Sequence, residues 1–535
     1  MAEAPDAARR LLLQAAAAYA IGGPAAARAQ AAPAGNNTAP SSPKPSTAPR
    51  LALVIGNSAY RQVPVLQNPG NDAAAVSGAL KASGFEVTQL TDCTRAQMMD
   101  GVRAYTEQLR LQQGIGLFYF AGHGLQLAWH NYLLPIDASI PTAADVPRQG
   151  VDVADLMTGL TRAANPLNVV ILDACRDNPF VEDRRADQKG LSQMDAPANT
   201  LLAYATSPGN TASDGAGANG LYTEHLVREM GAANAKIEDV FKRVRLGVRR
   251  KSAGQQIPWE STSLEEDFYF RPPPAAAAPV SEAEQTLKLD EEFAAFMALR
   301  GGKDPAALEE FLRRYPSGRY SELALLSLDR LLAAQGERKI AVPSAEGNPF
   351  TQGTRVANIR FQVGDRYGYR VTGLEDPSQV RTFTHRVTAI TDNEVIFNEG
   401  KMITDLLGNT VLADGRRFSP RQDQATEYTV GKRWFSRFRV VDADDKERWL
   451  DQEFRVAARE SVTVPAGKFD CYRIEGRGTG SRGRSTLESR LTYWMAPEKV
   501  RRYIRLDVTR HMVNSRGILK TVSAERFELV DFRQA

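Results

Sequence analysis

Two short apolar runs, each followed by one reactive side chain, constrain the fold of this 535-residue chain more than any other feature. Residues 117–122 lead into His123 and Gly124, and residues 169–174 lead into Cys175. Both runs are uninterrupted and rich in β-branched or aromatic residues, which is typical of strands buried on both faces of a parallel sheet. Ligands of open α/β sheets bind outside the carboxyl ends of the strands. The sequence therefore predicts His123 and Cys175 at two strand tips on one edge of a sheet.

This placement favours nucleophilic catalysis. A cysteine attacks as the thiolate, and a neighbouring imidazole can take its proton or hold it in an ion pair. The backbone N–H groups of Gly124 and Cys175 are two candidate donors to a developing oxyanion. The alternatives are a small buried cysteine and a structural histidine. Because both side chains follow apolar strands and charged residues flank the cysteine, we favour the catalytic interpretation.

The motifs around these residues resemble the caspase superfamily. His-Gly follows one hydrophobic strand, and Asp-Ala-Cys-Arg follows a second one, with Cys175 placed 52 positions after His123. Residues 51–60, the Asn-Asp-Ala at 71–73 and the late strand at 201–207 resemble other parts of the family. The resemblance covers about residues 50–271. It implies a caspase-like, doubly wound α/β domain with cysteine endopeptidase activity.

One position sets this chain apart from animal caspases. Asp173 stands two residues before Cys175, where they carry Gln. In this the chain resembles paracaspases, metacaspases and their bacterial relatives, which cleave after Arg or Lys. The resemblance implies a specificity pocket formed by Asp72, Asp173 and Asp214, because carboxylates suit a cationic side chain and reject an anionic one. The alternatives are a helix N-terminal charge for Asp72 and a solvated turn residue for Asp214.

Alternating patterns over residues 51–271 predict a parallel sheet with helices on both faces. Strands are predicted at 51–56, 85–90, 115–121, 168–173 and 201–206, and helices near 70–83, 94–110, 151–163, 220–231 and 236–250. The large-subunit-like part is about 51–180 and the small-subunit-like part about 200–271. Residues 180–199 are polar and without periodicity, which indicates a surface loop. Caspases are cut in the matching loop, so self-cleavage after Arg184, Arg185 or Lys189 is a hypothesis, with a plain solvated loop as the alternative.

The rest of the chain contains five further segments. Residues 1–31 read as an export signal, with a basic start, a short Leu/Ala-rich stretch and a small-x-small site, and they predict a periplasmic or cell-envelope location in a bacterium. Residues 32–50 and 272–280 are Pro/Ala-rich linkers. Residues 281–336 predict a helical, tetratricopeptide-like module. Residues 348–535 predict an antiparallel β domain, either a sandwich or a strongly curved sheet.

The composition does not favour several classes of ligand and partner. The net charge is +4, so the sequence does not indicate nucleic-acid binding, and no membrane span is expected after signal removal. Three cysteines (Cys93, Cys175 and Cys471) are too few for a disulfide framework or a zinc site.

The sequence therefore predicts a thiol endopeptidase that acts on polypeptides after a basic residue, without a required cofactor. Some metacaspases need calcium, so calcium dependence stays open, as does the oligomeric state. The second hypothesis is a catalytically silent caspase-like scaffold whose helical and β modules mediate envelope binding or signalling.

Overall fold

The computed structural model describes residues 48–174, 190–210, 217–273, 282–340, 345–482, 485–513 and 519–535. Several predicted features lie outside the described residues, namely the export signal at 1–31, Cys175, the loop residues Arg184, Arg185 and Lys189, and Asp214. Among the described helices, none is both long enough and apolar enough to cross a membrane.

A six-stranded sheet organises the caspase-like part, in the order β2-β1-β3-β7-β8-β9. Its strands are β1 (Arg50–Gly56), β2 (Glu86–Thr91), β3 (Ile115–Ala121), β7 (Leu167–Asp173), β8 (Thr200–Tyr204) and β9 (Trp259–Thr262). The first five run parallel, and each matches a predicted strand within two residues. The predicted α/β sheet is therefore confirmed.

The last strand corrects the prediction of an all-parallel sheet. β9 pairs antiparallel with β8, so the sheet is mixed. Two consecutive helices, α5 (Leu221–Met230) and α6 (Ile237–Lys251), separate β8 from β9. A β–α–β unit has one helix between two parallel strands. The second helix here returns the chain to the other end of the sheet, so β9 runs in the opposite direction to β8.

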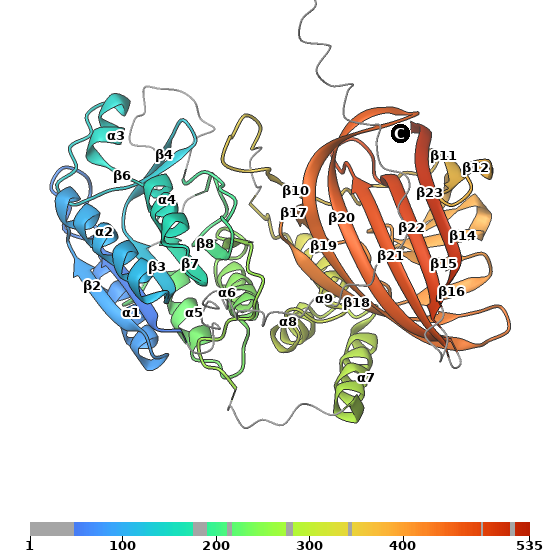
Figure 1. Ribbon diagram of the computed structural model, residues 1–535, viewed down its shortest axis with the longest axis horizontal. Helices are drawn as coiled ribbons and strands as arrows, with labels where there is room; N and C mark the ends of the chain where they lie inside the picture. The colour runs from blue at the N-terminus through green and yellow to red at the C-terminus, as the bar shows by residue number, and fades with distance from the viewer. Residues whose placement is uncertain are drawn as a thin grey trace, which may run out of the picture. The chain divides into compact units, whose positions relative to one another are not determined.

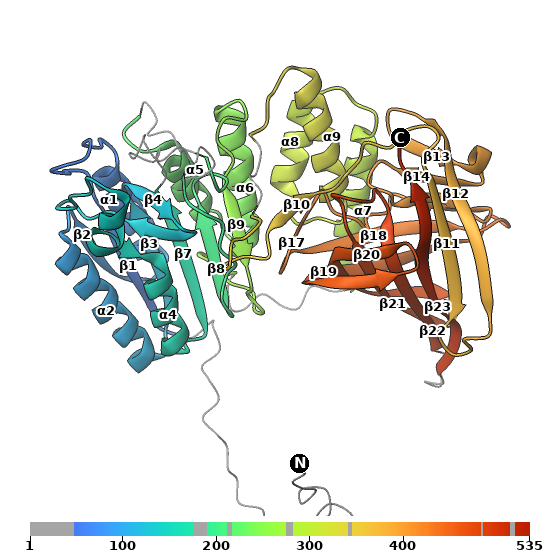
Figure 2. The same cartoon turned by 90° about the horizontal axis from the view of Figure 1, so that it is seen from above.

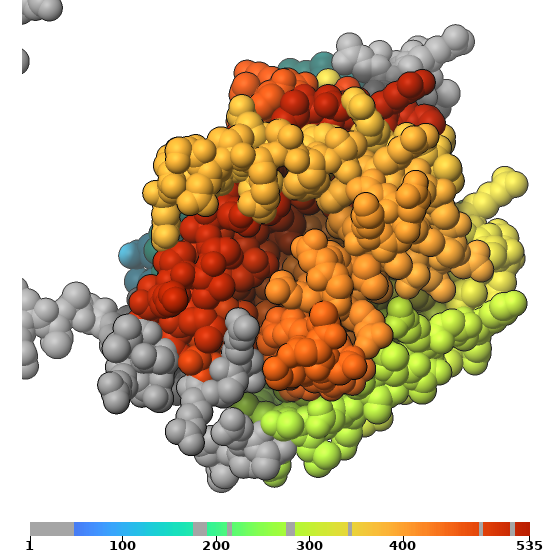
Figure 3. Space-filling view, turned by 90° about the vertical axis from the view of Figure 1, so that its right-hand side faces the viewer, coloured from blue at the N-terminus to red at the C-terminus, as the bar shows by residue number. Residues whose placement is uncertain are grey.

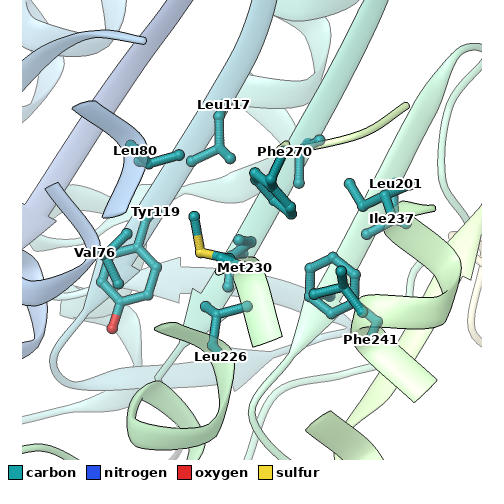
Figure 4. Packing of buried hydrophobic residues seen from close by; sticks show 14 of the residues in the cluster. Val76, Leu80, Leu117, Tyr119, Leu201, Leu226, Met230, Ile237, Phe241 and Phe270 are labelled. Carbon is teal, nitrogen blue, oxygen red and sulfur yellow. The ribbon is translucent and has the colours of Figure 1, made fainter. Parts of the chain in front are cut away.

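Helices cover both faces of this sheet (Figures 1 and 2). α1 (Pro69–Ala82), α5 and α6 pack on one face, and α2 (Arg95–Gln112) and α4 (Val153–Ala163) pack on the other. Successive residues of β3 alternate between the two cores: Leu117 and Tyr119 belong to the first, and Phe118 and Phe120 to the second. Figure 4 shows side chains of the first core between sheet and helices. Burial on both faces is why the run contains no polar residue.

A small three-stranded sheet follows directly after His123. It contains β4 (Gly124–Leu127), β5 (His130–Leu133) and β6 (Val151–Asp152), and helix α3 (Val146–Gln149) precedes β6. β4 and β5 form a hairpin in which Gly124 pairs with Leu133. This hairpin fixes the chain on the carboxyl side of His123.

Three helices follow the sheet domain, α7 (Glu282–Leu299), α8 (Pro305–Arg314) and α9 (Ser321–Ala334). They share one apolar cluster that includes Phe296, Phe311 and Tyr320. Helix α8 begins at the N-cap Asp304, whose carboxylate accepts a hydrogen bond from the Ala306 N–H. The helices occur where the sequence predicts them, and their role as a separate module stays a prediction.

The C-terminal part is a closed antiparallel barrel of twelve strands, so the sandwich alternative is wrong. The strands are β11 (Arg366–Gly373), β12 (Val380–Ile390), β13 (Glu394–Phe397), β14 (Met402–Asp405), β15 (Thr410–Ala413), β16 (Arg416–Ser419), β18 (Arg433–Val441), β19 (Glu447–Val464), β20 (Gly467–Arg482), β21 (Ser485–Met495), β22 (Tyr503–Val513) and β23 (Leu519–Arg533). β23 closes the barrel by pairing with β11. Register shifts in several pairs bend the strands, and a twisted sheet of this size curls on itself. Figure 3 shows the surface hollowed between these strands. A separate pair, β10 (Thr354–Val356) and β17 (Glu427–Thr429), lies outside the barrel sheet.

Candidate active site

His123 follows the tip of β3, and its ring is held by a backbone carbonyl. The His123 Nε2 lies 2.6 Å from the carbonyl oxygen of Pro64. Because a carbonyl only accepts hydrogen bonds, Nε2 carries the hydrogen. In the neutral imidazole Nδ1 is then the basic nitrogen. This tautomer suits an acid–base partner for a thiol.

Tyr60 fixes the His123 backbone and ring from a third segment. The His123 N–H donates to the Tyr60 hydroxyl at 2.7 Å, and the two ring centroids are 4.4 Å apart. That hydroxyl also donates to the carbonyl of Leu134 at 3.2 Å. Gly122 permits this close approach: its φ is +153°, and a Cβ there would lie 2.5 Å from the Tyr60 hydroxyl oxygen.

The two predicted strand tips meet at one edge of the sheet. β3 and β7 pair in parallel up to Ala121 and Asp173, and the Gly122 N–H donates to the Asp173 carbonyl at 3.3 Å. A Cβ on Gly124 would lie 3.0 Å from the Cβ of Ala174. The structure therefore brings His123 and Gly124 beside the residue that precedes Cys175, whereas Cys175 itself lies outside the described residues.

Asp173 ends β7 within a network of two hydroxyl groups. Its Oδ2 accepts hydrogen bonds from Thr223 Oγ1 at 2.7 Å and from the Tyr119 hydroxyl at 3.2 Å. The Tyr119 and Thr223 oxygens are themselves 2.6 Å apart. Tyr119 comes from β3 and Thr223 from the first turn of α5, so two elements far apart in sequence orient this carboxylate.

Asp72, the second predicted acid, lies in the first turn of α1. It is 4% exposed, and its Oδ1 accepts hydrogen bonds from the Asn219 side chain and the Gly220 N–H, both at 2.9 Å. The alternative interpretation, a helix N-terminal charge, explains its position in α1 but not these contacts. The pKa of Tyr119 is raised well above its usual range, first by burial and then by the charges of Asp173 and Asp72. Two of the three predicted acids thus act on one buried tyrosine.

Sequence reasoning missed the residues that orient this site. Pro64 and Thr223 lie in segments without a recognisable motif, and Tyr119 reads as one apolar position of a buried strand. Their roles arise from contacts over sequence separations of 50 to 59 residues. Such pairings are visible only once the strand order is known.

Three other aromatic or histidine side chains lie in structural surroundings. Trp259 is 2% exposed and packs on Tyr204, so it is a core aromatic. His130 Nδ1 lies 2.7 Å from a carboxylate oxygen of Asp152 at the far end of the hairpin. His225 is only 7% exposed. Among the described residues, no three His, Cys, Asp or Glu side chains gather as metal ligands.

Comparison with known proteins agrees with this geometry. Residues 49–269 match the family model described as the caspase domain, so this part of the chain is similar to the caspase-like cysteine peptidases. The chain is 29% identical over 187 residues to the mucosa-associated lymphoid tissue lymphoma translocation protein 1 of Homo sapiens, and equally to its Mus musculus homolog. The match covers 34% of this chain and only 22% of each relative. The resemblance to the caspase superfamily is therefore confirmed.

Replacing Gly122 with Ala tests how tightly the His123 turn is built. The new Cβ would collide with the Tyr60 hydroxyl at an unfavourable φ, so we expect a loss of more than about 1 kcal/mol of stability in chemical denaturation. The matched control is Gly78→Ala in α1, where no atom lies within 4 Å and Ala should stabilise by about 0.5–1 kcal/mol. Equal stability of the two variants would show that the turn tolerates a side chain.

Proposed function

We propose that the protein is a cysteine endopeptidase that cleaves after Arg or Lys. The observation that carries the proposal is the pair of acids, Asp72 and Asp173, around Tyr119 at the sheet edge that also holds His123. A guanidinium or ammonium side chain binds carboxylates through charge-assisted hydrogen bonds, so a pocket with two acids favours a cationic substrate side chain. Asp214 is proposed as a third acid of the same pocket.

The proposed reaction uses Cys175 and His123. The Cys175 thiolate attacks the scissile carbonyl carbon, and the oxyanion that forms is stabilised by the N–H groups of Gly124 and Cys175. The His123 imidazolium then gives its proton to the leaving amine, and the C–N bond breaks to leave a thioester. His123 next accepts a proton from water, whose oxygen attacks the thioester and releases Cys175. No step requires a cofactor.

The remaining cysteines favour selective chemistry at Cys175. Burial raises the pKa of Cys93 to about 11 and that of Cys471 to about 12, so both remain protonated thiols at neutral pH. We also propose that residues 1–31 direct export to a bacterial periplasm or envelope. That compartment oxidises thiols, and burial of Cys93 and Cys471 keeps them from pairing with the nucleophile.

The second candidate is the silent scaffold, in which the helices and the barrel act in envelope binding or signalling. The closed barrel and the apolar helix cluster give such modules a stable core. A single labelling experiment distinguishes the two candidate functions. A catalytic site reacts selectively with an arginyl electrophile at Cys175, and a silent one does not.

The main test compares initial rates on two matched fluorogenic peptides, one ending in Arg and one in Asp. We expect cleavage of the Arg peptide only, and a loss of about 10³-fold or more in the Cys175→Ala variant, because the nucleophile is removed. An unaffected rate in that variant would end the proposal. Adding calcium to both reactions determines whether the metal matters.

Self-processing is a separate prediction. If the enzyme prefers basic residues, it should cut its own chain after Arg184, Arg185 or Lys189, and the purified protein should resolve into two bands on a denaturing gel. The variant with Gln at all three positions should stay whole, whereas Lys303→Gln, an exposed change elsewhere, should be cut normally. A single wild-type band alongside Arg-peptide cleavage would refute self-processing.

A further inference from the structure

Residues 190–196 are the described end of the loop predicted at the surface over 180–199. Leu191 to Met194 are buried, so the surface prediction is wrong for them, and they pack on the His123 side of the site. Leu191 is fully buried, and its Cδ2 would lie 3.2 Å from a Cβ on Gly124. The Ser192 N–H donates to the Asn131 side chain at 2.7 Å, and that side chain donates back to the Ser192 carbonyl at 2.9 Å. Asn131 lies in β5, the partner of β4 in the hairpin that begins at Gly124. Residues 190–196, called the return segment, thus support the hairpin.

A second segment far along the chain, residues 348–354, fastens the return segment. We call it the strap. The Asp195 N–H donates to the carbonyl of Phe350 at 2.9 Å. The Asp195 carboxylate accepts hydrogen bonds from Thr351 Oγ1 at 2.6 Å and from the Gln352 N–H at 2.7 Å. Three bonds therefore hold this one residue from both its main chain and its side chain.

Further contacts flank Asp195 on either side. The Asn348 side chain donates to the Gln193 carbonyl at 2.8 Å, and the Gln193 side chain donates to Thr354 Oγ1 at 3.0 Å. All three of these residues are at least 93% buried. The Phe350 ring also packs edge-on against the His130 ring of β5, with centroids 4.7 Å apart. The strap consequently touches the hairpin directly as well as through the return segment.

Burial raises the pKa of Asp195, and its hydrogen bonds from the strap act in the opposite direction. A partly buried carboxylate that loses its hydrogen-bond donors raises the free energy of the folded state. Loss of the Thr351 hydroxyl would leave Asp195 Oδ1 without this donor and would therefore weaken the attachment of Asp195 to the strap. Only three residues separate Asp195 from Leu191, so a displaced Asp195 would also loosen the contact at Gly124.

We propose that the strap is a positioning element of the catalytic site, in which Thr351 and Asp195 hold Leu191 against Gly124 and so fix the oxyanion donor. This inference rests on the proposed peptidase function. It gives the chain beyond the caspase-like domain a role in catalysis, because the strap leads directly into β10.

The test uses Thr351→Val in the full chain, with Thr351→Ser as the conservative rescue. Thr388→Val, which removes a hydroxyl that bonds to Ile396 within the barrel, is the matched control. We expect kcat on the Arg peptide to fall about tenfold or more in Thr351→Val with KM nearly unchanged, since a displaced oxyanion donor weakens only the transition state. Ser should restore kcat to within about twofold, because it returns the hydroxyl, and the control should match wild type.

A second readout is independent of catalysis. Hydrogen exchange of the hairpin Gly124–Leu133 should be faster in Thr351→Val than in wild type, Thr351→Ser or Thr388→Val. Unchanged kcat in Thr351→Val, or an equal fall in Thr388→Val, would overturn the proposal. If the wild-type protein cleaves no peptide, the proposed function fails, and unchanged exchange would then also reject the strap as a support of the hairpin.

Discussion

The parallel pairing of β3 with β7 is the constraint on which the rest of the site depends. It sets Ala121 opposite Asp173, so the residues after both strands leave the sheet at the same point. Slipping this register by one residue would turn every side chain of one strand to the other core. The two apolar cores, one on each face, oppose such a slip. The position of His123 beside the end of β7 thus follows from the burial of residues that take no part in the proposed chemistry.

Around that edge, orientation comes from polar contacts between distant segments. Pro64 sets the tautomer of His123, Tyr60 sets its place, and Tyr119 with Thr223 sets Asp173. Each of these groups donates or accepts within a largely buried setting, where an unmet hydrogen bond is costly. Under the proposed function, the fold prepares acid–base chemistry and recognition of a cation before any substrate binds.

Much of this fold could be predicted from the sequence because its strands are buried on both faces. An unbroken apolar run such as 115–121 permits few other structures, and the motif at His123 marks where it ends. The antiparallel β9 and the closed barrel could not be predicted. The direction of β9 depends on the path of the chain between β8 and β9, and closure of the barrel depends on the pairing of its first and last strands. Neither feature produces a local sequence pattern. The same holds for Tyr119 and Thr223, whose hydroxyls meet Asp173 only across the sheet.

The central claim is that Asp72 and Asp173 recognise a basic side chain, and binding of agmatine tests it most directly. Agmatine carries the guanidinium of arginine without a peptide bond, so calorimetric titration reports recognition apart from cleavage. We predict binding to the Cys175→Ala protein, a loss of about 30-fold or more when Asp173→Asn is added, and no change when Asp145→Asn is added instead, in a short 3-10 helix (Ala143–Asp145) away from the pair of acids. Equal affinity of all three proteins for agmatine, or no binding by any of them, would contradict the account.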